Sequence, residues 1–240
     1  MSKKLKKITI MVPCYNEEKG VGNVIDGIPK EKLKELGFDV KIIVIDNNSK
    51  DKTCEVARKK GAIVISETKQ GKGNAIRTGF QSISKDTDFV VMLDGDDTYK
   101  GFEIPRLIEP LENDFCDAII GSRLEGKMNK NAMSLSHRTA NWFFTFITRH
   151  FYSGANVTDT CTGFFAWKAD VVRKLNGYIE SPGFAIEAEM ITKMSRLGYK
   201  IYSVPITYDP RHGESKLAPI GDGLRITWML FKNITWKPGK

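Results

Sequence analysis

The chain has 240 residues, of which 41% are hydrophobic and 28% are charged, and this composition excludes a disordered chain, a collagen-like repeat and a coiled coil. Its 37 basic and 29 acidic residues give a net charge of +8, which favours partners that carry phosphate, such as a nucleic acid or an anionic membrane surface. No apolar run reaches the ~18 to 20 residues that span a bilayer, and the basic N-terminus lacks a signal-peptide pattern. We therefore expect a cytoplasmic protein.

Apolar, strand-like runs alternate with helix-like segments along the first half of the chain. The strand-like runs cover residues 8–12, 41–45, 62–66, 89–93 and 117–120. The segments with helical spacing cover residues 17–36, 51–60 and 73–84. This alternation predicts an α/β fold with a mostly parallel central sheet covered by helices on both faces. Ligands of such a sheet bind at the carboxyl ends of its strands.

An acidic motif, Asp94-Gly95-Asp96-Asp97, directly follows the fourth strand-like run. A hard cation such as Mg²⁺ or Mn²⁺ binds one or two carboxylates together with substrate phosphate oxygens. The same residues also fit an Asx-rich turn that caps a helix. Their position at a strand end favours the metal site.

Two other strand ends carry residues suited to a nucleotide. Lys72 lies between Gly71 and Gly73 before a predicted helix, where backbone N–H groups and the helix dipole favour a phosphate. A plain strand-to-helix turn fits those residues equally well. Asp46 can accept hydrogen bonds from a base or ribose, or it can cap the following helix.

Charged residues in the C-terminal half are candidates for binding a second phosphate group. The basic ones are Arg123, Arg138, Arg211 and Lys216. Solvated surface charge is the default interpretation of any one of them. Glu187 and Glu189 precede a predicted helix, where they either supply first-turn charge or position the acceptor or its arginine.

Two aromatic segments have an amphipathic character. Residues 224–236 predict a helix of ~20 Å, which is shorter than the ~30 Å hydrocarbon core of a membrane. This segment is either an interfacial helix anchored by Trp228 and Trp236 or a helix docked on the sheet. The run at 142–147 is compatible with a core helix, a membrane contact or a lipid-tail groove.

Seven motifs, taken together and in this order, resemble the family 2 glycosyltransferases, and among them the dolichol-phosphate mannose synthase and polyprenyl-phosphate glycosyltransferase group. The resemblance extends over about residues 8–220. The motifs lie at residues 12–17, 45–53, 71–73, 94–96, 121–123, 159–164 and 211–217.

The resemblance implies a GT-A fold, which is Rossmann-like, and inverting transfer of a sugar from a nucleotide sugar to dolichyl or another polyprenyl phosphate, with Mg²⁺ or Mn²⁺ as cofactor. Residues 1–220 would form a single GT-A domain, with a nucleotide-sugar half at about 1–122 and an acceptor half at about 123–220. Residues 221–240 would form an amphipathic helix at the membrane surface.

Carried over position by position, the resemblance gives each site residue a role. Asp94 and Asp96 would bind the metal. The nucleotide sugar would be held by Pro13, Tyr15, Glu17, Asp46, Lys72 and Asp94. The acceptor phosphate would be held by Arg123, Arg138, Arg211, Ser215 and Lys216. The catalytic residues would be Asp96, Arg123 and Arg138.

Two departures from the family pattern concern the nucleotide base and the sugar of the donor. Asn47 and Asn48 stand where a second Asp and a Gly are frequent, which leaves uridine and guanosine open. Thr98 stands where mannose synthases often place a glutamine, so UDP-glucose or UDP-N-acetylglucosamine is favoured over GDP-mannose.

Two alternative functions remain open at this point. One is a family 2 glycosyltransferase that acts on a glycan or protein acceptor. The other is a nonenzymatic nucleotide- or nucleic-acid-binding protein, although the chain contains no recognisable nucleic-acid module. We expect the partners to be a nucleotide sugar, a polyprenyl phosphate and the cytoplasmic membrane surface, and no nucleic acid. The protein would be peripheral on the inner face and would supply lipid-linked sugar for glycosylation.

Overall fold

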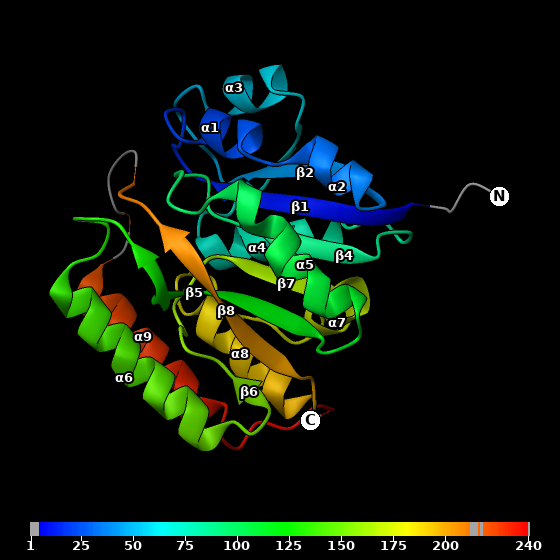
Figure 1. Ribbon diagram of the computed structural model, residues 1–240. Coiled ribbons are helices and arrows are strands. Elements are labelled where there is room, and N and C mark those ends of the chain that lie inside the picture. The colour runs from blue at the N-terminus through cyan, green and yellow to red at the C-terminus, as the bar shows by residue number, and fades with distance from the viewer. Residues whose placement is uncertain (1–4, 212–215, 217, 240) are drawn as a thin grey trace.

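The computed structural model describes residues 5–211, 216 and 218–239, and its strands and helices alternate as the sequence predicts (Figure 1). The strands are β1 (Lys6–Cys14), β2 (Phe38–Asp46), β3 (Ile63–Ser66), β4 (Phe89–Met92), β5 (Ala118–Met128), β6 (Ala155–Asn156), β7 (Phe165–Lys168) and β8 (Ile201–Tyr208). The helices are α1 (Val21–Asp26), α2 (Lys30–Glu35), α3 (Thr53–Lys59), α4 (Lys72–Gln81), α5 (Ile104–Glu112), α6 (Leu135–Phe151), α7 (Ala169–Leu175), α8 (Ile186–Arg196) and α9 (Pro219–Lys232).

The described strands form one sheet in the order β3-β2-β1-β4-β7-β5-β8-β6. All neighbours in this sheet are parallel except β7, which runs antiparallel to both β4 and β5. The prediction of a mostly parallel sheet is therefore confirmed. In consequence the carboxyl ends of β1, β2 and β4 lie at the same edge.

Helices cover both faces of the sheet, as the apolar strands predict (Figure 1). Along β1, Ile10 and Val12 pack in the core cluster that contains residues of α1 and α5, whereas Met11 packs in the cluster that contains residues of α4 and α8. Alternate side chains of a strand point to opposite faces, so a strand buried on both faces must be apolar throughout.

The segment predicted as one helix at 17–36 forms two helices. α1 ends at Asp26 and α2 begins at Lys30. The break falls at Pro29, because proline has no N–H to donate within a helix and disfavours helical backbone at the preceding residue.

The predicted C-terminal helix starts earlier and ends earlier than 224–236. Pro219 occupies its first turn, where a missing N–H costs nothing, and the helix ends at Lys232. Trp236 therefore lies beyond α9, and its ring packs on Tyr178 at 5.2 Å rather than anchoring the helix. Trp228 is on the helix, and 68% of its surface is exposed.

α6 and α9 lie side by side and form a layer that α8 joins to the rest of the fold (Figure 1). Each aromatic segment forms a helix with one buried side, as a core or docked helix would have, and contact of the exposed side with a membrane stays a prediction. Phe144 and Ile147 of α6 are buried with Ile226 and Leu230 of α9, while other aromatic side chains of the two helices are exposed. In the part of the chain that the structure describes, no helix is long and apolar enough to cross a membrane.

Candidate active site

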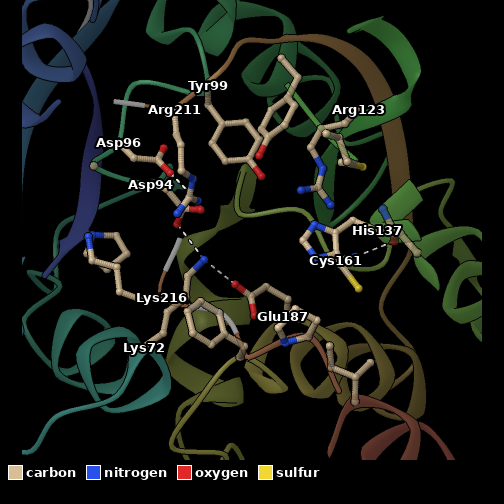
Figure 2. A pocket seen from close by; sticks show the side chains of 18 of the residues that line it. Lys72, Asp94, Asp96, Tyr99, Arg123, His137, Cys161, Glu187, Arg211 and Lys216 are labelled. Carbon is tan, nitrogen blue, oxygen red and sulfur yellow. Dashed lines mark hydrogen bonds and ion pairs between the residues drawn. The ribbon is translucent and has the colours of Figure 1, made fainter. Parts of the chain in front are cut away.

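A cavity of about 840 Å³, called the polar cavity below, opens at the carboxyl ends of β1, β2 and β4 (Figure 2). It contains most of the predicted site residues: Pro13, Tyr15, Glu17, Lys72, Asp94, Asp96, Arg123, Arg211 and Lys216. Residues from the N-terminal ends of α6 and α9, among them Ser134, His137 and Pro219, complete its lining. Segments that are far apart in sequence therefore meet in one site.

The two carboxylates after β4 are each paired with a cation. Asp94 Oδ1 lies 2.8 Å from Lys72 Nζ, and Asp96 Oδ2 lies 2.7 Å from an Arg211 nitrogen. The other oxygen of Asp96 accepts hydrogen bonds from the backbone and hydroxyl of Thr98, at 3.2 and 2.7 Å. Thr98, which the sequence marked only as a departure from the family pattern, thus fixes the orientation of Asp96.

The donor set around these carboxylates suits Mg²⁺ or Mn²⁺. Carboxylate oxygens are hard ligands, and the side chain of Asp94 is 22% exposed towards the cavity. Within the described ranges, no group of three or more His, Cys, Asp or Glu side chains is placed to hold a metal ion. A divalent ion bound to Asp94 and Asp96 would therefore need oxygens from a ligand to complete its coordination.

Lys72 is a half-buried cation held between two carboxylates (Figure 2). Its ammonium lies 2.6 Å from Glu187 Oε1 in addition to Asp94. Burial lowers the pKa of Lys72, but the charges of Asp94 and Glu187 outweigh that effect, so the pKa is raised above its ordinary value. Glu187 therefore positions a lysine, and not the arginine that the sequence left open.

Asn47 holds the loop that leads to Lys72. Its Nδ2 donates to the carbonyls of Glu67 and Lys69 at 3.2 and 3.0 Å, and its Oδ1 accepts from the backbone N–H of Gly71 at 2.6 Å. An amide can donate and accept at once, whereas an aspartate can only accept. The sequence marked Asn47 as unusual but gave no signal for this role, because its partners lie more than 19 residues away.

A second loop supports the same lysine from the other side. The carboxylate of Glu189, on α8, accepts the backbone N–H groups of Glu180 and Ser181, and it pairs with Lys193 at 2.7 Å. Both side chains of that pair are almost fully buried. In the same loop, the carbonyl oxygen of Pro182 accepts a hydrogen bond from the backbone N–H of Gly73, with 2.9 Å between nitrogen and oxygen. Glu189 therefore anchors a loop rather than serving as a solvated first-turn charge.

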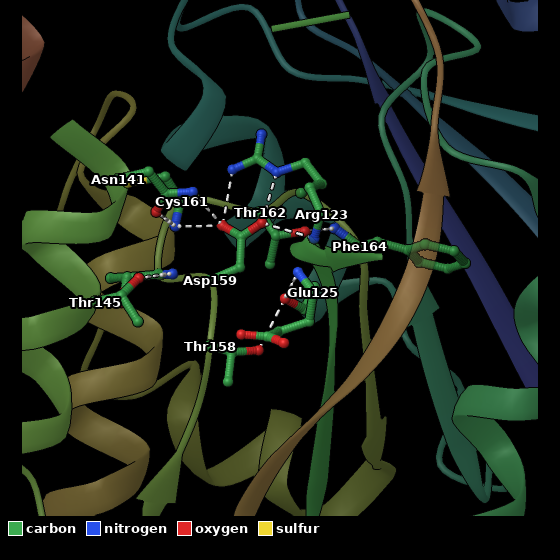
Figure 3. A network of polar contacts seen from close by, with 12 residues as sticks. Arg123, Glu125, Asn141, Thr145, Thr158, Asp159, Cys161, Thr162 and Phe164 are labelled. Atoms are coloured by element: carbon green, nitrogen blue, oxygen red, sulfur yellow. Dashed lines mark hydrogen bonds and ion pairs between the residues drawn. The ribbon is translucent and has the colours of Figure 1, made fainter. Parts of the chain in front are cut away.

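The sequence predicts a strand at 117–120 that ends before Arg123, but β5 continues to Met128, so Arg123 lies within the strand. The Asp159 carboxylate binds its side chain (Figure 3). Its Nε and Nη2 donate to the two carboxylate oxygens at 2.7 and 2.8 Å, and its backbone N–H donates at 2.9 Å. Asn141 of α6 donates to the same carboxylate at 2.7 Å. Asp159 takes up only part of the five-donor guanidinium, whose charge also lies 5.2 Å from the ring of Tyr208.

The environment of Arg123 keeps it charged. Burial lowers its pKa, but the adjacent Asp159 carboxylate raises the pKa well above the ordinary value. Asp159 is fully buried and Arg123 nearly so. Although Asp159 lies in the 159–164 motif, the sequence did not assign it a partner.

Lys216 and Glu17 form another pair across the polar cavity, with 3.1 Å between Nζ and Oε1. Burial raises the pKa of Glu17 to about 7, against the opposing effect of Lys216. Lys216 also donates to the carbonyl of Asn16 at 3.3 Å. The chain after β8 is thus tied to the loop after β1.

Three predicted site residues do not join this group. Asp46 is buried and is not part of the cavity lining; its Oδ1 accepts the backbone N–H of Ser49 at 3.2 Å, so it closes the turn after β2. Arg138 is exposed on α6 and lines a different hollow. Ser215 lies outside the described residues.

The chain matches the protein family described as Glycosyl transferase family 2 over residues 9–175. It belongs to the family 2 glycosyltransferases. The resemblance noted in the sequence is therefore confirmed, and so is its assignment as an enzyme.

Three relatives illustrate the range of the similarity. The glycosyltransferase is 32% identical to the low-salt glycan biosynthesis hexosyltransferase Agl6 of Haloferax volcanii, over 93% of this chain and 53% of that protein, so it spans about half of Agl6. It is 32% identical to a dolichyl-phosphate hexose transferase of the same organism, over 91% of this chain and 90% of the other. It is 30% identical to an undecaprenyl-phosphate mannosyltransferase of Micrococcus luteus, over 88% of each chain.

Solved structures share the architecture. The crystal structure of Mycobacterium tuberculosis glucosyl-3-phosphoglycerate synthase with Mn²⁺ and UDP-glucose has a TM-score of 0.71 and 21% identity, and the similarity covers 98% of this chain and 81% of that one. The fold of the glycosyltransferase is GT-A, as expected.

The contact between the two loops at Lys72 generates a prediction about Gly73. A Cβ on Gly73 would lie 1.8 Å from the carbonyl oxygen of Ser181, so Gly73→Ala must push the loops apart. We expect destabilisation of about 1–3 kcal/mol and weaker nucleotide binding, measured by thermal unfolding and calorimetry. Gly183→Ala, whose Cβ meets nothing within 4 Å, is the matched control. Unchanged nucleotide binding in Gly73→Ala would contradict the role of this contact.

The Arg123–Asp159 pair generates a second prediction. Asp159→Asn removes the charge that balances a buried guanidinium, so we expect a loss of roughly 3 kcal/mol in the free energy of unfolding. Denaturant unfolding measures this loss. Asp39→Asn, the same change at an exposed position, should leave stability within ~0.5 kcal/mol of the unmodified chain. Equal stability of the two variants would refute a structural role for the pair.

Proposed function

We propose that this glycosyltransferase transfers a sugar from a nucleotide sugar to dolichyl or another polyprenyl phosphate, with inversion at the anomeric carbon and with Mg²⁺ or Mn²⁺ as cofactor. The observation that carries the proposal is the polar cavity, where the Asp94 and Asp96 carboxylates lie near an independently held cation, Arg123. Transfer between two phosphate-bearing substrates needs this combination of an acidic metal site and separate positive charge.

The donor half of the proposal uses residues 1–122. Pro13, Tyr15 and Glu17 line the polar cavity at the end of β1, beside Asp94 and Lys72. When bound, the divalent ion would neutralise charge on the donor diphosphate. Lys72 is a protonated donor next to the same carboxylate, so it adds positive charge where the leaving oxygen becomes negative.

The preferred donor is a UDP-sugar. Thr98 occupies the place where mannose synthases often have a glutamine and is engaged with Asp96. The preference for UDP-glucose or UDP-N-acetylglucosamine over GDP-mannose rests on the absence of that glutamine, and not on the hydrogen bond of Thr98. Asp46 is buried and does not line the polar cavity, so we assign contact with the base or ribose to Tyr15 and Glu17, which do line it, rather than to Asp46.

The acceptor half uses residues 123–220. Arg123 presents its remaining donors to the polar cavity, and Arg211 and Lys216 add two further cations at its edge. A phosphate monoester has a second pKa of about 6 and is mostly dianionic at pH 7, so it needs positioning and charge screening rather than a general base. The acceptor oxygen would bond to the anomeric carbon as the bond to the donor diphosphate breaks.

The names of the relatives support a prenylated acceptor, since two of them are described as dolichyl-phosphate and undecaprenyl-phosphate transferases. An acceptor of that kind resides in a membrane. We therefore include in the proposal that the enzyme works as a peripheral protein at the inner, cytoplasmic membrane face and supplies lipid-linked sugar for glycosylation.

The direct test incubates the protein with a polyprenyl phosphate, Mg²⁺ or Mn²⁺ and a panel of UDP- and GDP-sugars. We expect one glycosylated lipid phosphate, detected by mass spectrometry, and its loss when EDTA removes the cation from Asp94 and Asp96. A product that persists in EDTA would refute the metal dependence. Absence of product with every donor, while nucleotide binding is intact, would shift the acceptor to a glycan or a protein.

A variant at Arg123 separates the acceptor from the donor. Lysine keeps the charge but cannot bond to Asp159 and a phosphate in the same forked geometry. We expect Arg123→Lys to lower kcat/KM for the polyprenyl phosphate about 10²-fold while nucleotide binding, measured by calorimetry, stays the same. Arg58→Lys, at an exposed position on α3, is the control. If Arg123→Lys transfers normally, the phosphate acceptor is wrong.

A further inference from the structure

A second hollow, called the α6 hollow below, lies between α6 and the strand β5. Its volume is about 620 Å³, and it shares no lining residue with the polar cavity among the described residues. Arg138, Trp142, Phe146, Arg149 and His150 line it from α6. None of the residues that line it has a role in the proposed transfer reaction.

The charge of the α6 hollow is predominantly positive. Arg138 and Arg149 are eleven residues apart, about three helical turns, and so lie on the same side of α6. No ion pair is formed by either guanidinium within residues 5–211, 216 and 218–239. The sequence of α6 contains no acidic residue, and Glu125 is the one carboxylate in the lining. Two arginines in one hollow favour a phosphate ligand.

Three stacked aromatic side chains of α6 line the same hollow as these two arginines. Trp142 stacks on Phe146, and Phe146 stacks on His150, each with 6.0 Å between ring centroids. Trp142 and Phe146 remain 62% and 55% exposed. The ligand site is therefore basic and amphipathic, with an open apolar side.

The surface next to the α6 hollow is unusually apolar. α6 and α9 lie side by side, and the rings of Phe151 and Phe231 are 6.4 Å apart at their C-terminal ends (Figure 1). The exposed apolar side chains of the two helices are Leu135, Trp142, Phe143, Phe146, Phe151, Ile220, Leu224, Trp228 and Phe231. Monomeric proteins rarely expose such a set together unless it binds a partner.

The charges around this apolar surface identify the partner. Arg225 and Lys232 of α9 are exposed beside it and pair with Asp222 at 3.0 Å and with Glu180 at 3.8 Å, whereas the arginines of the α6 hollow form no ion pair within the described ranges. Helices with an apolar aromatic face and basic edges bind anionic lipid bilayers. A second copy of the chain would instead bring like charges together, which disfavours self-association.

We propose that the α6 hollow binds the phosphate of an anionic phospholipid headgroup while the exposed side chains of α6 and α9 enter the bilayer interface. This rests on the membrane location in the proposed function and deepens it, because it names the surface and the class of lipid that would hold the enzyme there, and that lipid is not the sugar acceptor. Ser134, His137 and Pro219, at the N-terminal ends of the same helices, line the polar cavity. Docking therefore brings the cavity to the surface in which a prenylated acceptor resides. Arg138 then binds a headgroup phosphate instead of the predicted acceptor phosphate.

The test measures binding of the full chain to vesicles without donor or acceptor, so its outcome is independent of the transfer reaction. Flotation compares vesicles of phosphatidylcholine with vesicles that also contain phosphatidylglycerol. We expect binding to the mixed vesicles only, and about fivefold weaker binding for Arg149→Gln. Arg58→Gln, the same change on α3 away from α6, should bind as the unmodified chain does (Figure 1). Trp228→Ser should also weaken binding, because it removes an exposed apolar ring.

Several results would overturn the inference. Equal losses in Arg149→Gln and Arg58→Gln would mean that only net charge matters and that the α6 hollow is no site. Binding to vesicles with polyprenyl phosphate but not to those with phosphatidylglycerol would assign the hollow to the acceptor. Saturable binding of inorganic phosphate by the unmodified chain, abolished in Arg149→Gln and without vesicle binding, would assign it to a free phosphate. A dimer that Trp228→Ser dissociates would assign the apolar surface to a second copy.

Discussion

The salt bridges of Lys72 join the three segments on which the site depends. One ammonium at the start of α4 pairs with Asp94 after β4 and with Glu187 at the start of α8. Without it, two largely buried carboxylates would face each other unbalanced, which is costly in a medium of low polarity. The loops on either side of Lys72 follow from this requirement: Asn47 holds one, and the buried Glu189–Lys193 pair holds the other.

Arg123, like Lys72, is a cation held by a carboxylate from a different segment of the chain. Its charge is balanced by Asp159 and oriented by a fork of hydrogen bonds, so the guanidinium is in place before any ligand arrives. Asn141 links this pair to α6. Charges fixed in advance cost no reorganisation when a substrate binds, and this is the main source of electrostatic catalysis in enzymes. The polar cavity thus combines a pair of carboxylates, Asp94 and Asp96, with a guanidinium, Arg123, and each is stabilised by its own partners.

α6 and α9 serve two surfaces at once. Their buried sides, with Phe144, Ile226 and Leu230, pack against each other and towards α8, while their N-terminal ends reach the polar cavity. Their outer sides keep aromatic rings and basic residues exposed. A helix pair of this kind couples the position of the active site to whatever covers its outer surface, because neither helix can shift without moving the cavity wall.

The sequence by itself determined the family, the parallel sheet, the strand end that Asp94 follows and the helix start at which Lys72 lies. These features depend on local patterns: apolar runs form strands buried on both faces, and parallel strands bring their carboxyl ends to one edge. The tertiary structure alone decided the partners of Asn47, Glu189 and Asp159, because those contacts join residues remote in the chain or depend on how the intervening backbone folds. It also decided that Arg138 lines the α6 hollow and not the polar cavity, because the rotation of α6 is set by the packing of its buried side chains and not by its own sequence pattern.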